Sequence, residues 1–137
     1  MKQRLLVLYQ LLTGASDAAT GVLLLVAPAF TLRLMRLHAP AEAALVYLSY
    51  MGAFVLAVGM ACLYGAWLAT RTGGAAKLEV VWLLTAITRG VVAVFVAAKV
   101  LSGALEAGWF TVALSDGSYA VLQIVGLTRG WLSDAAA

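Results

Sequence analysis

Four apolar segments dominate this sequence, and each is long enough to cross a membrane as a helix. They cover residues 3–34, 41–69, 75–101 and 105–127. About 20 mostly apolar residues in a helix span the hydrocarbon core of a bilayer. The segments are apolar on all sides instead of alternating, which argues against membrane strands. We therefore predict one all-α domain over 1–137: a four-transmembrane-helix bundle, up-down-up-down, with both termini on the same side.

The composition agrees with lipid as the surrounding solvent. Of the 137 residues, 64% are hydrophobic and 11% are charged. Soluble domains carry about 25% charged residues, and a compact domain of this size cannot hide so much apolar surface from water. The net charge of +3 forms no basic patch, so we expect no nucleic-acid partner. Cys62 is the only cysteine, which excludes an intrachain disulfide and a CxxC motif.

The first segment has a signal-peptide-like beginning. Lys2 and Arg4 precede the apolar stretch 5–12, as in a secretory leader. Apolar character resumes at 22–30, so we expect a retained first helix, and Pro28 is expected to kink or stop it.

The basic residues indicate an orientation, because loops on the cytoplasmic side carry more Lys and Arg. In the predicted topology the side of the termini holds five of them and the opposite side three: Lys2, Arg4, Arg71, Lys77 and Arg129 against Arg33, Arg36 and Lys99. We expect cytoplasmic termini in a bacterial inner membrane.

Three ionisable residues fall well inside the predicted spans: Asp17, Arg89 and Asp116. A charge at the membrane centre costs at least about 2.5–3.5 kcal/mol, so such residues face the bundle interior and pair. The arginine offers a forked donor set that suits two carboxylates. We expect these three residues to meet in a buried cluster.

Polar and aromatic residues follow the same helix faces as the buried charges. Trp82 and Thr85 share a face with Arg89, while Tyr119 and Gln123 share one with Asp116, and Trp109 lies one step before. These residues complete the candidate site, which contains no catalytic residue and no metal ligand. The cluster fits a structural clamp or a pocket for a polar headgroup or small molecule. A proton or ion path and catalysis by the two acids remain open alternatives.

His38, the only histidine, lies in the basic connector 33–40. We expect it to be solvated or to face lipid headgroups, with metal or haem ligation as the alternative. Glu106 is expected to be solvated or paired with Lys99. The sequence contains no phosphate-binding loop, nucleophile elbow or HExxH motif, and it identifies no cofactor.

Two stretches carry a family resemblance. They are TGVLLLVAP (20–28) and YMGAFVLAVGM (50–60), and with them the chain resembles the small DoxX-like four-helix membrane proteins. The resemblance implies a compact four-helix bundle and a role as an accessory subunit or small-molecule binder. It carries over no catalytic residue, and the cysteines of some redox relatives have no counterpart beyond Cys62.

From these observations we expect a non-enzymatic membrane protein. It would act as an accessory subunit or as a binding module for a lipid, quinone or other amphipathic molecule. Because almost no mass lies outside the predicted spans, homo- or hetero-oligomers would form within the bilayer. A small proton- or ion-coupled transporter that uses Asp17 and Asp116 is the alternative.

Overall fold

The computed structural model describes residues 2–136, with side-chain burial defined for 3–133. Helices make up 85% of the structure, and the described part contains no strand. The elements are α1 (Lys2–Val26), α2 (Pro28–Leu34), α3 (Glu42–Ala69), α4 (Ala75–Leu101), the short 3-10 helix η1 (Ala107–Trp109), α5 (Phe110–Thr128) and α6 (Trp131–Ala136).

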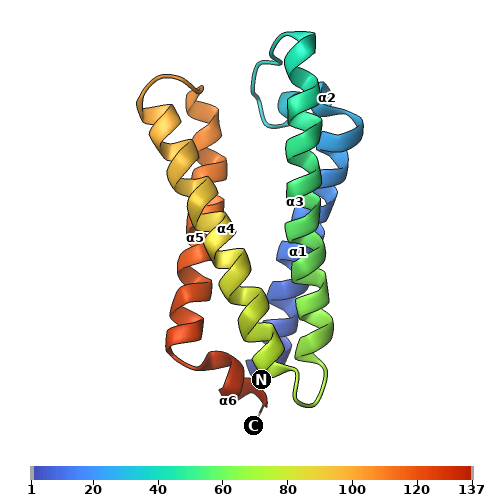
Figure 1. The fold of residues 1–137 in the computed structure, drawn as a ribbon, viewed down its shortest axis with the longest axis vertical. Coiled ribbons are helices and arrows are strands. Elements are labelled where there is room, and N and C mark those ends of the chain that lie inside the picture. Colours follow the sequence, from blue (N-terminus) through green and yellow to red (C-terminus); the bar gives the residue numbers. More distant parts are fainter. Residues whose placement is uncertain (1, 137) are drawn as a thin grey trace.

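The long helices form two antiparallel pairs, α1 with α3 and α4 with α5 (Figure 1). The pairs lie close together at the end where α1 begins and α6 ends the chain, and they diverge toward the end that carries α2. The beginning of α1 and the last helix therefore lie at the same end of the molecule.

Glycines bring α1 and α3 into direct backbone contact. A Cβ atom added to Gly14 would lie 2.8 Å from Cγ of Leu63, and one added to Gly52 would lie 2.8 Å from Cβ of Leu24. Real Cβ atoms do not approach other atoms so closely, so only glycine fits at these positions. The α1–α3 pair is consequently the most tightly packed part of the fold.

The common end of the two pairs holds a small apolar core. Leu68, Leu78, Trp82 and Leu132 pack there, from α3, α4 and α6. Nearby, the side-chain amide of Gln3 donates a hydrogen bond to the carbonyl oxygen of Ala69 at 2.9 Å. The apolar core joins the α1–α3 pair to the α4–α5 pair beside the turn between α3 and α4, and the Gln3 bond ties the beginning of α1 to the end of α3.

Among the described residues, three helical segments are long and apolar enough to cross a membrane. They are α3, α4 and the segment Ala107–Thr128, which combines η1 and α5. The 25-residue α1 is not among them. It carries several polar side chains, including Gln10, Thr13 and Asp17.

Two element boundaries differ from the sequence expectation. The helix predicted over 3–34 is interrupted at Ala27, whose φ of −148° is not helical, because Pro28 has no N–H to continue the ladder and instead begins α2. The segment predicted over 105–127 begins with an extended Glu106, followed by η1. A further helix, α6, follows α5 where no separate helix was predicted.

Candidate functional site

Arg89 lies in the middle of α4 and joins three helices through one guanidinium group. Its Nη1 donates a hydrogen bond to Oδ1 of Asp116 on α5 at 2.6 Å. Its Nη2 donates to Oδ2 of Asp17 on α1. The predicted buried salt bridge of Arg89 is confirmed, and the structure places both acids on it.

The positive and negative side chains of this cluster differ in their exposure to solvent. The Arg89 side chain is 4% exposed, whereas those of Asp17 and Asp116 are 18% and 19% exposed. The Tyr119 ring covers the guanidinium, with its centroid 4.8 Å from Cζ of Arg89. With one cation and two anions, the ionised cluster has a net charge of −1, and its accessible part is carboxylate.

A second polar layer lies next to the cluster, toward the common end of the pairs. Gln123 donates from Nε2 to Oγ1 of Thr85 at 3.0 Å, which links α5 to α4. Trp82 is buried and meets the Tyr9 ring edge to face at a centroid distance of 5.5 Å. Tyr9 also reaches Tyr119, with centroids 6.1 Å apart.

The structure therefore groups Thr85, Tyr119, Gln123 and Trp82 around the ion pairs, as the sequence suggested. Trp109 does not belong to this group. It lies half-buried in η1, at the opposite end of α5 from Gln123, and among the described residues it makes no hydrogen bond or aromatic contact with this group.

Two residues of this site were missed by sequence reasoning, Tyr9 and Gln10. Gln10 is 0% exposed and lies against Gly65 of α3, where a side chain would collide with its amide. A signal for it exists in the sequence, since Gln10, Thr13 and Asp17 recur at i, i+3 and i+7, on one face of a helix.

Several buried polar atoms in this region make no hydrogen bond to the described part of the chain. They are Tyr9 Oη, both amide atoms of Gln10, Trp82 Nε1, Arg89 Nε and Gln123 Oε1. More than nine in ten buried polar groups in proteins have a partner. Buried polar groups of this kind are commonly satisfied by ordered water molecules.

A different ion pair joins the two helix pairs at their diverging end. Nδ1 of His38, in the connector after α2, lies 3.0 Å from Oε2 of Glu106, and the backbone N–H of His38 donates to Oε1 at 3.3 Å. Glu106, which was expected to be solvated or paired with Lys99, is partly solvated, with its side chain 45% exposed, and its partner is His38. The carboxylate raises the pKa of His38, mainly through the hydrogen bond, and His38 lowers the pKa of Glu106 in turn.

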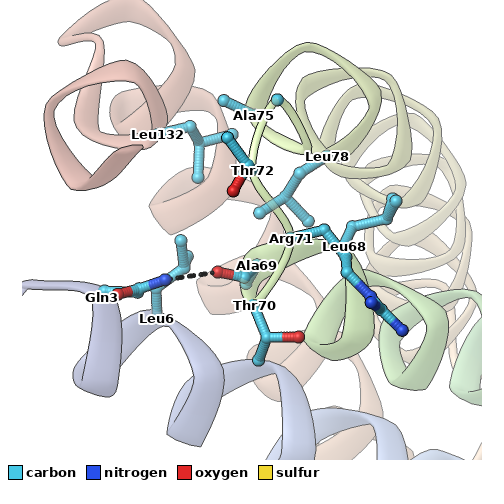
Figure 2. A pocket seen from close by; sticks show the side chains of 11 residues that line it. Gln3, Leu6, Leu68, Ala69, Thr70, Arg71, Thr72, Ala75, Leu78 and Leu132 are labelled. Atoms are coloured by element: carbon cyan, nitrogen blue, oxygen red, sulfur yellow. Dashed lines mark hydrogen bonds between the residues drawn. The ribbon is translucent and has the colours of Figure 1, made fainter. Parts of the chain in front are cut away.

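A shallow hollow of about 270 Å³ lies at the common end (Figure 2). Its walls come from α1, the end of α3, the turn after it, the beginning of α4, and α6, and they include Gln3, Thr72, Leu78 and Leu132. It is separated from the Arg89 cluster by the apolar core. Within the described residues, no group of His, Cys, Asp and Glu side chains is arranged to hold a metal ion.

Comparisons with protein-family models, with curated proteins and with solved structures found no match for this chain.

Proposed function

We propose that this chain is a non-enzymatic membrane protein that crosses the bilayer four times. It binds an amphipathic molecule of the lipid or quinone type where its two helix pairs meet. The observation that carries the proposal is the buried Arg89, whose two carboxylate partners come from the other pair and from its own.

Of the four proposed membrane crossings, only α1 is not among the helices that are long and apolar enough to be recognised as spans. With 25 residues and 1.5 Å per residue, α1 is about 37 Å long, more than the roughly 30 Å of hydrocarbon. Its charged residue Asp17 has a cationic partner, which offsets the cost of burying it. The tight packing of α1 along α3 also supports placing both at the same depth.

The contact between the helix pairs supports binding. At mid-length it consists of charged and polar side chains, and several of their atoms have no partner among the described residues. Away from this layer, large apolar side chains such as Leu84, Val94 and Phe95 are exposed on the outside, as expected for lipid-facing helices. An amphipathic guest can place its head in the polar layer and its tail among these apolar surfaces.

The same exposed apolar faces support a role as a subunit. Almost no described mass lies outside the long helices, so a partner would be met through the spans, in a homo- or hetero-oligomer. The resemblance to DoxX-like proteins agrees with an accessory or binding role. The bacterial inner membrane, with both termini in the cytoplasm, is the location we propose from the basic residues.

Mass spectrometry of the purified protein tests this function. The protein is exchanged into nanodiscs of defined lipid, extracted with organic solvent and compared with empty nanodiscs. We expect a lipid or quinone that is retained at a fixed ratio to protein and is depleted in Asp116→Asn. The control is Glu79→Gln, which neutralises an exposed acid on α4, away from the cluster. If nothing is retained beyond the nanodisc lipid, the proposed binding role is wrong.

The excess of one negative charge favours a second candidate, a proton- or cation-coupled transporter that uses Asp17 and Asp116. Reconstitution into proteoliposomes with an internal pH dye separates the two candidates. Transport predicts a proton flux that disappears in Asp116→Asn and persists in Glu79→Gln. A binding module predicts no flux in either protein.

A further inference from the structure

We infer that the Arg89 cluster selects guests whose head donates hydrogen bonds, an amine or a hydroxyl, and rejects carboxylates and phosphates. This inference rests on the proposed binding function and specifies the chemistry of its ligand.

Both Nη groups of Arg89 are already occupied, and its Nε is buried without a partner among the described residues. Each of its Nη atoms is directed at a carboxylate, Nη1 at Asp116 and Nη2 at Asp17. The Tyr119 ring lies over the guanidinium, and only 4% of the side chain is exposed. An anionic head cannot reach this cation without displacing one of the acids.

The acids are the part of the cluster that a guest can touch. Each is bonded to Arg89 through one oxygen, Oδ2 of Asp17 and Oδ1 of Asp116. Each therefore has a second oxygen, and the two side chains are about one-fifth exposed. An ionised carboxylate is only an acceptor, so its matching partner is an N–H or O–H donor, and a cationic donor forms the stronger bond.

A second observation points to the same region independently of the acids. Gln123 is 1% exposed and lies seven residues from Asp116, on the same face of α5. Its Nε2 is used by Thr85, whereas its Oε1 has no partner among the described residues. This buried acceptor lies two helical turns along α5 from Asp116, so a guest that extends from the carboxylates toward Gln123 can donate a hydrogen bond to it. Among quinone-type molecules, the site would prefer the hydroxyl-bearing quinol to the quinone.

Three probes that share an alkyl tail and differ in the head test this selectivity. Octylamine, octanol and octanoate are titrated by calorimetry into the protein in phosphatidylcholine nanodiscs, with empty nanodiscs as the blank. We expect saturable binding of octylamine and octanol. The Kd for octanoate should be at least about tenfold weaker than that for octylamine. The Glu79→Gln protein, which loses an exposed acid away from the cluster, should give the wild-type order.

Neutralising the acids should reverse the order. In Asp17→Asn with Asp116→Asn, the cluster changes from a net charge of −1 to +1, so octanoate should bind more tightly than octylamine. If the double variant does not fold, the single Asp116→Asn change makes the cluster neutral, and the ratio of the two Kd values should fall toward one.

The results of these titrations distinguish a wrong ligand selectivity from a wrong binding function. Tighter binding of octanoate than of octylamine to the wild-type protein overturns the inference and leaves a binding module. An unchanged order in the double variant, or an unchanged ratio of the two Kd values in Asp116→Asn, also overturns it, because the selectivity then lies elsewhere. The absence of saturable binding for all three probes overturns both the inference and the proposed function.

Discussion

Arg89 satisfies two carboxylates with a single guanidinium, and this arrangement fixes where three helices meet. A buried ion pair is costly to form, and removing one partner is more costly because the remaining charge is left without compensation. The side chains of Asp17 and Asp116 are therefore constrained to the positions that Arg89 can reach. The residues of α1, α4 and α5 at that depth are held in register as a consequence.

His38 provides a residue-level prediction that a single resonance can test. Because His38 is the only histidine, its imidazole signals in an NMR titration are assigned without ambiguity. We expect a pKa above the usual 6.5, caused by the Glu106 carboxylate, and a return toward 6.5 in Glu106→Gln. A wild-type pKa at or below 6.5 would show that the pair does not form in solution.

The His38–Glu106 ion pair also predicts the pH range in which the connector after α2 and the loop after α4 are joined. The His38 pKa is raised, so its contribution is present below pH 6.5 and is lost as the pH rises through the elevated value. The Glu106 pKa is lowered from 4.5, so its contribution is present above pH 4.5 and is lost as the pH falls through the depressed value. The contributions of His38 and Glu106 to the stability of this ion pair are therefore both fully present between about pH 4.5 and 6.5.

The sequence predicted the charged part of the site but not its neutral part. The cost of a charge in hydrocarbon requires partners, and Arg89 with two acids was the only mid-span combination available. Neutral side chains such as Gln10 and Tyr9 carry a smaller penalty, so nothing in the sequence required them to be buried. The pairing of His38 with Glu106 joins residues 68 positions apart, and it depends on how two loops meet in space.

The α1–α3 pair shows how helix packing depends on the absence of side chains. At Gly59, an added Cβ would lie 2.9 Å from Cα of Ala18, which is backbone and cannot move aside. At Gly117 on α5, the nearest atom to an added Cβ is Cβ of Ala93 at 3.6 Å, an ordinary contact. The two glycines sit in comparable helix interiors and differ only in what surrounds them.

Alanine at these two positions should therefore have opposite effects. We expect Gly59→Ala to lower the free energy of unfolding by about 1–3 kcal/mol, as overpacking does. Gly117→Ala should be neutral or raise it by about 0.5–1 kcal/mol, because glycine is unfavourable inside a helix. Thermal unfolding of both variants in the same detergent measures this. Equal melting temperatures would contradict the close packing of α1 on α3.

The elements themselves were largely predictable, and their interruptions less so. Long apolar stretches and the turn between Ala69 and Ala75 indicated α3 and α4 almost to the residue. The break at Ala27 was expected near Pro28 but not its exact place. The final helix α6 was not expected, because a stretch as short as Trp131–Ala136 has too few residues for a recognisable period and is stabilised through Leu132, which is buried in the apolar core.

At the scale of the whole molecule, the proposed topology predicts which surfaces a membrane-impermeant maleimide can reach. In a Cys62→Ala background, Ala104→Cys lies in the exposed loop after α4, and Ser133→Cys lies on α6. We expect labelling of Ala104→Cys in intact cells and of Ser133→Cys only after permeabilisation. Labelling of both positions from outside would contradict four crossings with cytoplasmic termini.

The whole fold is two helix pairs that share an apolar core at one end, a polar cluster at mid-length and an ion pair at the other end. Of these three contacts, the cluster is the one on which the binding proposal depends. Its removal should loosen the attachment of one pair to the other, whereas the packing inside the α1–α3 pair should survive.

Thermal unfolding of Arg89→Ala, compared with Arg89→Ala in which Asp17 and Asp116 are also changed to Asn, tests this directly. The single change should lower the free energy of unfolding by about 3–5 kcal/mol, because it leaves two mostly covered carboxylates unpaired. The triple change should recover much of that loss, since Asn carries no charge. An Arg89→Ala protein that melts like the wild type, or a triple variant less stable than the single one, would contradict the account.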